Sequence, residues 1–237
     1  MSEKKFDIYL EFNYSKLSLA AFNKANDKLE HYNETTYKSY YNNNNELNFE
    51  KLDKIIEEKI LEIEKATGEY VRDIYLIIET PQSLSLKLSV SKNNEGNKVT
   101  KEDAMYLVQS SKQQILKSND DFEILHILVE NYILDGTQYK FLPLENKCNQ
   151  FSIDVKFICF PKYLLKSFEK LFINHQIYIN KFICENYLKT FNFEDKEQNI
   201  CKYARDIVRG INKQEVVSIP KENKKKGFFE KLFHFFK

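Results

Sequence analysis

Tryptophan is absent from this chain of 237 residues, and glycine is scarce, at five residues. Glycine lets backbone amide groups approach a phosphate closely, so a chain with few glycines is poor material for a phosphate-binding loop. The sequence also contains no GxSxG, HExxH or GxxxxGK[ST] motif. We therefore expect a protein that is not an enzyme.

Long apolar runs and an excess of charge are missing as well. No run approaches the roughly 18 apolar residues that a membrane-spanning helix needs, and the start, MSEKKFDIYLEF, lacks the apolar core of a signal peptide. Lys and Arg number 36 against 35 Asp and Glu, which argues against nucleic acid as a partner. With 42% hydrophobic residues, the chain is expected to form a folded core and to stay in the cytoplasm.

Cysteine and histidine form no ligand pattern. The four cysteines make no CxxC pair and have no histidine at ligand spacing, so we expect buried free thiols at Cys148, Cys159, Cys184 and Cys201. His126 lies in an apolar stretch and is expected to be a packed or hydrogen-bonded core residue. The sequence predicts no metal site.

Alternating and helical patterns predict the order of elements in the first third. A helix is expected between Asn48, a good N-cap, and Gly68, because its apolar residues step by three and four. The first two strands form a hairpin, and Pro81 ends the fourth. The expected strands cover residues 6–12, 17–21, 29–37 and 73–79.

A second unit of α+β type is expected after Pro81. Thr100 and Asp103 have the spacing of a capping box at the start of a helix, and Pro161 opens another helix as its first residue. The strands expected in this unit cover residues 84–90, 122–134, 151–159 and 177–179. After it, residues 194–210 are expected to be helical and residues 216–219 extended.

The last residues, KKKGFFEKLFHFFK, are expected to form an amphipathic membrane-binding helix. On a helical wheel the apolar side chains fall within an arc of about 160°, and the polar ones fall outside it. A packed C-terminal core helix is the alternative, but the polar linker 221–226 and the use of phenylalanine rather than aliphatic residues favour an anionic membrane surface. The expected membrane-binding residues are Phe228, Phe229, Leu232, Phe233, Phe235, Phe236, Lys224, Lys225, Lys226 and Lys231.

Three segments carry a resemblance to a known family: EILHILVENYILDG at residues 123–136, VTKEDAM before it and ICENYL at 183–188. They resemble FtsA, the bacterial actin-like protein that tethers the division ring to the membrane, and the first segment is the most specific. The order of elements is similar over residues 6–190, and the C-terminal helix is similar too. The second half of the actin-like ATPase has no counterpart, because only 47 residues follow Thr190.

The resemblance implies an α+β fold. It would consist of a reduced actin-like (ribonuclease-H-like) N-terminal subdomain, an inserted strand-helix-strand-strand-helix-strand subdomain and a C-terminal amphipathic helix. The expected parts are the partial actin-like subdomain 1–80, the inserted subdomain 81–182, a return helix and closing segment 183–219, the basic linker 220–226 and the membrane-targeting helix 227–237.

The resemblance also places a degenerate phosphate loop between the first two strands, at Glu11, Asn13, Ser15 and Lys16. The family has a glycine-containing turn there, whereas this chain has EFNYSK. Only Ser15 and Lys16 remain of the family pattern, so we expect no cofactor. Residues 206–210 are expected to be a helix C-terminus rather than a second phosphate loop.

The function implied is that of a non-enzymatic membrane tether and scaffold of the cell-division machinery, on the cytoplasmic side of the bacterial inner membrane at the division site. The implied partners are an anionic membrane surface, division proteins such as FtsZ or later septal proteins, and further copies of this chain. Two alternatives remain open: a residual actin-like ATPase that uses Ser15 and Lys16 to bind ATP, and an actin-like scaffold of pilus assembly.

Overall fold

The computed structural model describes residues 4–13, 16–36, 47–191 and 199–216, which form a mixed α/β structure with two sheets. The first sheet has five strands in the order β3-β2-β1-β4-β9. The hairpin β1-β2 and strand β3 are antiparallel, whereas β4 and β9 run parallel to β1. These strands are β1 (Phe6–Phe12), β2 (Lys16–Asn23), β3 (Leu29–Thr36), β4 (Asp73–Ile78) and β9 (Tyr178–Cys184).

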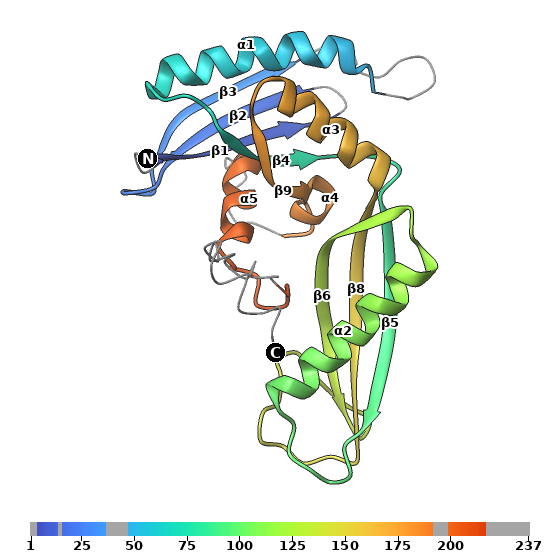
Figure 1. The fold of residues 1–237 in the computed structure, drawn as a ribbon. Coiled ribbons are helices and arrows are strands. Elements are labelled where there is room, and N and C mark those ends of the chain that lie inside the picture. The colour runs from blue at the N-terminus through green and yellow to red at the C-terminus, as the bar shows by residue number, and fades with distance from the viewer. Residues whose placement is uncertain (1–3, 14–15, 37–46, 192–198, 217–237) are drawn as a thin grey trace, which may run out of the picture.

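Helices cover both faces of this sheet. In Figure 1, α1 (Phe49–Thr67) and α3 (Lys162–Asn174) lie on one side, and α4 (Glu185–Leu188) and α5 (Ile200–Val208) lie on the other. Strands β1 and β4 are almost fully buried between these layers, as expected for parallel strands of a covered sheet. The end of β1 therefore lies deep in the molecule.

The second sheet is longer and narrower. It has the order β5-β8-β6-β7, all antiparallel, with α2 (Lys101–Ser118) packed on one face (Figure 1). Its strands are β5 (Leu84–Asn93), β6 (Phe122–Leu134), β7 (Thr137–Tyr139) and β8 (Gln150–Pro161). The apolar cores of the two sheets meet where Leu128, Ile158 and Phe160 join the core of the first sheet.

The local signals are confirmed. Asn48 caps α1 by accepting a hydrogen bond from the Lys51 amide, and Gly68 ends the helix in the left-handed conformation at φ 69°. Thr100 and Asp103 form both hydrogen bonds of the capping box of α2. Residues 206–209 end α5, followed by Gly210 at φ 80°, so this segment is a helix C-terminus as expected.

The grouping of the later elements differs from the prediction. Strand β9 pairs with β4 and belongs to the first sheet, although residues 177–179 were expected to be a strand of the inserted unit. About a hundred residues separate β4 from β9 in the sequence, and a parallel pairing between segments so far apart leaves no local sequence pattern. Pro161 is the last residue of β8, and α3 begins at Lys162. The expected helix 194–210 begins at Ile200 within the described residues.

Candidate functional site

Three parallel strands of the first sheet end at one edge, which is the usual position of ligand sites in such sheets. Phe12, the last residue of β1, pairs with Ile78, the last of β4, and Ile78 pairs with Cys184, the last of β9. The polar residues that flank these ends therefore come together. They are Glu11, Asn13, Glu79 and Glu185.

Two of the carboxylates are buried and linked by one amide. Glu11 is 1% exposed and Glu185 is 2% exposed. Asn13 Nδ2 lies 3.1 Å from Glu11 Oε1 and 3.5 Å from Glu185 Oε1, so it donates toward both. Two buried carboxylates thus share one neutral donor.

Each lysine of the site lies between two carboxylates. Lys16 Nζ lies 3.5 Å from Glu11 Oε2 and 3.1 Å from Glu34 Oε2. Lys189 Nζ lies 2.7 Å from Glu185 Oε1 and 3.2 Å from Glu79 Oε1. Both cations are therefore neutralised by the protein itself, and the cluster as a whole is anionic.

The electrostatics agree with this geometry. Burial raises the pKa of Glu11, and the nearby Glu185 raises it further. Burial also raises the pKa of Glu185 above its ordinary value, and the charge of Glu79 adds to this effect. Burial opposes the charged form of Lys189, but its bonds to Glu185 and Glu79 prevail and raise its pKa. An anionic ligand at this edge would be repelled by the carboxylates, because both lysines are already paired with them.

A cavity of about 680 Å³ opens beside the cluster. Glu11, Asn13 and Lys16 line one wall, and α5 supplies Ile200 and Tyr203 on another. The hairpin β2-β3 contributes Tyr32 and Glu34. The cavity is large enough for a small ligand, so its chemistry, not its size, decides what it can hold.

The predicted degenerate phosphate loop is brought to this cavity. Glu11, Asn13 and Lys16 lie together there, while Ser15 lies outside the described residues. The Asn13 amide donates to the Lys16 carbonyl at 3.2 Å, and the Lys16 amide donates to Asn13 Oδ1 at 3.0 Å. These two amides serve the turn and are not turned toward a ligand, which is the reverse of a phosphate cradle.

The residues therefore do not fit a nucleotide phosphate with its metal ion. The Asn13 and Lys16 amides bind within the turn, both lysines are paired, and the buried acids repel further negative charge. In the described part of the chain, no group of three His, Cys, Asp or Glu side chains has the arrangement of a metal site.

Glu79, Glu185 and Lys189 were missed as site residues by the sequence analysis. Glu79 directly follows the largely buried strand β4, and Glu185 directly follows the two buried residues that end β9, and this position was a usable signal. Using it required knowing that β4 pairs in parallel with β1 and that β9 pairs in parallel with β4. That information lies in pairings between distant segments and not in any local pattern.

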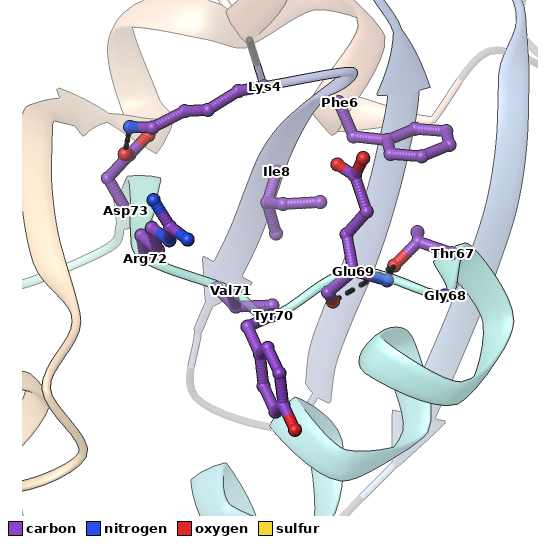
Figure 2. Close-up of a pocket in the computed structure, with 10 residues that line it drawn as sticks. All are labelled: Lys4, Phe6, Ile8, Thr67, Gly68, Glu69, Tyr70, Val71, Arg72 and Asp73. Atoms are coloured by element: carbon purple, nitrogen blue, oxygen red, sulfur yellow. Dashed lines mark hydrogen bonds and ion pairs between the residues drawn. The ribbon is translucent and has the colours of Figure 1, made fainter. Parts of the chain in front are cut away.

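A second cavity, of about 230 Å³, lies at the opposite ends of the strands, near the start of β1 and β4 (Figure 2). Lys4 pairs with Asp73, and Lys5 pairs with Glu69 at 3.5 Å, while Arg72 also lines the cavity. Tyr70 lies on its rim and is 82% exposed. The amino ends of parallel strands are not where such sheets bind ligands, and we assign no chemistry to this cavity.

His126 is a hydrogen-bonded core residue, as predicted. It is 1% exposed; its Nδ1 lies 2.8 Å from Glu215 Oε1, and its Nε2 accepts from the Cys184 amide at 3.1 Å. The Tyr187 hydroxyl donates to the other oxygen of Glu215 at 2.8 Å. This network joins β6, the end of β9 and the segment after α5. The four cysteines are free and buried, which confirms that prediction.

The predicted membrane-binding residues lie outside the described residues, because the structure describes nothing after Val216. The linker 220–226 and the helix 227–237 are therefore untested. Among the described helices, none is long and apolar enough to cross a membrane.

Comparison with known proteins finds similar structures but no similar sequences. No family model matches the chain, and no curated protein matches it. The solved structures similar to it include a PilM–PilN type IV pilus biogenesis complex, at 12% identity and a TM-score of 0.48, over 77% of this chain and 48% of that one.

Two further similar structures come from named bacteria. One is the cytoplasmic domain of EpsL, an inner-membrane component of the type II secretion system of Vibrio cholerae, at 5% identity and a TM-score of 0.39, covering 77% of this chain and 58% of that one. The other is a Bacteroides thetaiotaomicron protein with an actin-like ATPase fold and unknown function, at 9% identity and a TM-score of 0.36, covering 83% and 59%. The chain thus spans about half the length of these structures.

Proposed function

We propose that this chain is a non-enzymatic scaffold with a reduced actin-like core, attached to a membrane by its C-terminal residues. The observation that supports the non-enzymatic part is the closed network at the strand ends. Lys16 and Lys189 are each held between two carboxylates, and the turn after β1 uses its own amides. The edge where an actin-like protein would hold its nucleotide serves here to join the strands.

The actin-like (ribonuclease-H-like) part of the proposal is supported by the strand order of the first sheet. An antiparallel meander β1-β2-β3 is continued on its other side by the parallel strands β4 and β9. The second sheet is inserted between β4 and β9 in sequence. Apart from β9, which was expected in the inserted unit, this is the arrangement that the resemblance in residues 6–190 leads us to expect.

The membrane part of the proposal is supported by the sequence of the tail. Residues 221–237 contain six Lys and two Glu, a net charge of +4, and residues 228–236 contain six apolar side chains. Each cation near an anionic surface contributes about 1 kcal/mol, and the apolar face adds burial energy. One tail binds reversibly, so firm attachment requires several tails in one assembly. The protein would then lie on the cytoplasmic side of the inner membrane.

We consider two assemblies in which this scaffold would act, the cell-division machinery and a pilus-assembly system. The sequence resemblance to FtsA leads us to propose cell division, with FtsZ or later septal proteins as partners. The pilus-assembly alternative is kept, and among the similar structures are pilus and secretion proteins. A fluorescent fusion separates the two: a band at midcell favours division, whereas foci away from the septum favour pilus or secretion assemblies.

The tether is tested by sedimentation with anionic vesicles. We expect the full chain to sediment, and deletion of residues 227–237 to abolish this. Phe229→Glu combined with Phe233→Glu should do the same, because it places two charges on the apolar face. Replacing Lys224, Lys225 and Lys226 by Ala should weaken sedimentation and reduce its salt dependence.

The matched control is Phe141→Glu, which changes a phenylalanine that is 67% exposed on the folded part of the chain. It should leave sedimentation unchanged. Equal binding by the full chain and by the chain without residues 227–237 would refute the tether.

A further inference from the structure

The second sheet has one long edge with no strand partner in the described part of the chain. β5 is the terminal strand of the order β5-β8-β6-β7, and its ten residues pair with β8 on one side only. The opposite edge of the sheet is covered by β7 and by the segment around Glu215, which bridges to Leu128. Figure 1 shows β5 at the outer side of the molecule.

The edge of β5 has little of the usual protection. Its register with β8 runs without a bulge from Leu84 opposite Cys159 to Asn93 opposite Gln150. It contains no proline and no glycine, and its only charges are Lys87 and Lys92. Native proteins normally interrupt such an edge with bulges, prolines or several charges, because its backbone groups can pair with another strand.

The side chains of β5 alternate in a way that suits a further strand. The β5 side chains on the face toward α2 remain partly exposed, although the residues that lie opposite them on β8 are at most 1% exposed. An added strand would cover this row. Its residues are Leu84, Leu86, Leu88 and Val90. The other face of β5 is exposed and polar, with Ser85, Lys87, Ser89 and Ser91.

We propose that the occupant of this edge is β5 of a second copy of this chain, antiparallel, with Leu88 opposite Leu88 of the second copy. In this register Leu86 lies opposite Val90, so apolar residues meet on one face. Lys87 lies opposite Ser89 on the other face. The result is one continuous sheet across a two-fold axis, the commonest symmetry of protein dimers.

The charges of the sheet favour this register over its neighbour. Lys87 Nζ pairs with Glu130 Oε2 of its own sheet at 2.8 Å, and Ser89 Oγ donates to Asp154 Oδ1 at 2.6 Å, so the lysine that lies opposite Ser89 gains a second carboxylate on the next strand. A shift of two residues would instead place Lys87 opposite Lys87 of the second copy, and like charges in that position are unfavourable. The dimer goes beyond the proposed function and does not rest on it.

The test is Ser89→Lys in the full chain, measured by sedimentation velocity from micromolar to submillimolar concentration. We expect the wild type to shift from 28.3 kDa toward twice that mass. Ser89→Lys places a lysine opposite Lys87 at two symmetric positions, and should raise the dissociation constant by about tenfold. The added lysine can still pair with Asp154, and an unchanged Tm would show that the fold is intact.

A charge swap provides the rescue. Lys87→Glu added to Ser89→Lys restores opposite charges across the two-fold axis and should restore the dimer. Within one copy the new Glu loses the pair that Lys87 makes with Glu130, but it lies opposite Lys156 on β8. Thr137→Lys, which adds the same charge on β7 at the opposite edge of the sheet, is the matched control and should leave the dimer unchanged.

Three results would overturn the proposal: a wild-type chain that stays monomeric throughout the range, a dimer that Ser89→Lys leaves intact, or a dimer that Thr137→Lys weakens equally. If the chain associated through residues 227–237 instead, Ser89→Lys would leave the dimer intact. The register has its own readout, because paired strands bring opposite residues within disulfide distance. Leu88→Cys should therefore form a covalent dimer on oxidation, whereas Lys87→Cys should not.

Discussion

His126 has a defined proton arrangement because each ring nitrogen has a partner of fixed character. Glu215 can only accept, so Nδ1 must carry the proton, and the Cys184 amide can only donate, so Nε2 must be bare. A second proton on the ring would face that amide. Burial lowers the pKa of His126, although Glu215 opposes this shift. The folded protein therefore keeps this histidine neutral.

A pH dependence of stability follows from this residue. The unfolded chain takes up a proton on His126 near pH 6.5, whereas the folded chain does so only at lower pH. Its contribution is complete above pH 6.5 and is lost as the pH falls below that value. We expect the free energy of unfolding, measured by urea denaturation, to decrease between pH 7.5 and about pH 5.5.

The control for this prediction is His126→Asn, whose amide nitrogen can still donate to Glu215. The difference in unfolding free energy between wild type and variant should shrink as the pH falls. A comparison of the two chains is needed because Glu11 and Glu185 act in the opposite sense. Their pKa values are raised, so the stability that they contribute is lost as the pH rises through their range. A difference independent of pH would contradict the assignment.

At the scale of elements, the features set by neighbouring residues were predictable. The caps of α1 and α2 and the alternating strands β1, β2, β6 and β8 follow from residues a few positions apart, and the structure confirms them. Helix α4 has four residues and β7 has three, which is too short for a periodic signal. The site was only half predicted, because Glu11 and Lys16 are local to one turn, while Glu79 and Glu185 reach it through β4 and β9.

Residues 212–216, which follow α5, lie along β6 and extend the second sheet at that edge. The Val129 amide donates to the Gln214 carbonyl at 2.9 Å, and the Val216 amide donates to the Ile127 carbonyl at 2.8 Å. Asn212 Nδ2 donates to the Tyr187 hydroxyl at 2.7 Å. These bonds hold the residues directly before the proposed membrane tail against β6.

Two truncations test how much this segment contributes. A chain that ends at Ile211 loses Glu215 and leaves His126 and Tyr187 without their buried acceptor. We expect it to lose about 2 kcal/mol of unfolding free energy, the order for an unpaired buried polar group. A chain that ends at Val216 keeps every one of these contacts and should match the full chain. Equal stability of the two truncations in thermal or urea unfolding would contradict this account of the segment.

At the scale of the whole molecule, the two sheets differ in what they leave open. In the first sheet, polar contacts occupy the edge where such sheets usually bind ligands. In the second sheet, β5 has no strand partner on its outer side in the described part of the chain. The parallel strand ends of the first sheet are joined by Glu11, Asn13, Glu185 and Lys189. The edge of β5 in the second sheet points outward. Two copies joined there would also carry two tails in one assembly, and the effective concentration of the second tail would strengthen weak attachment. The proposed scaffold thus depends on contacts rather than on turnover.

The central claim is that the edge at Glu11 and Glu185 does not hold a nucleotide, and calorimetric titration of the full chain with Mg²⁺ and ATP tests it most directly. The account predicts no saturable heat at any ATP concentration up to the millimolar range, with Glu11→Gln giving the same trace. Saturable binding that requires Mg²⁺ and disappears in Glu11→Gln would contradict it.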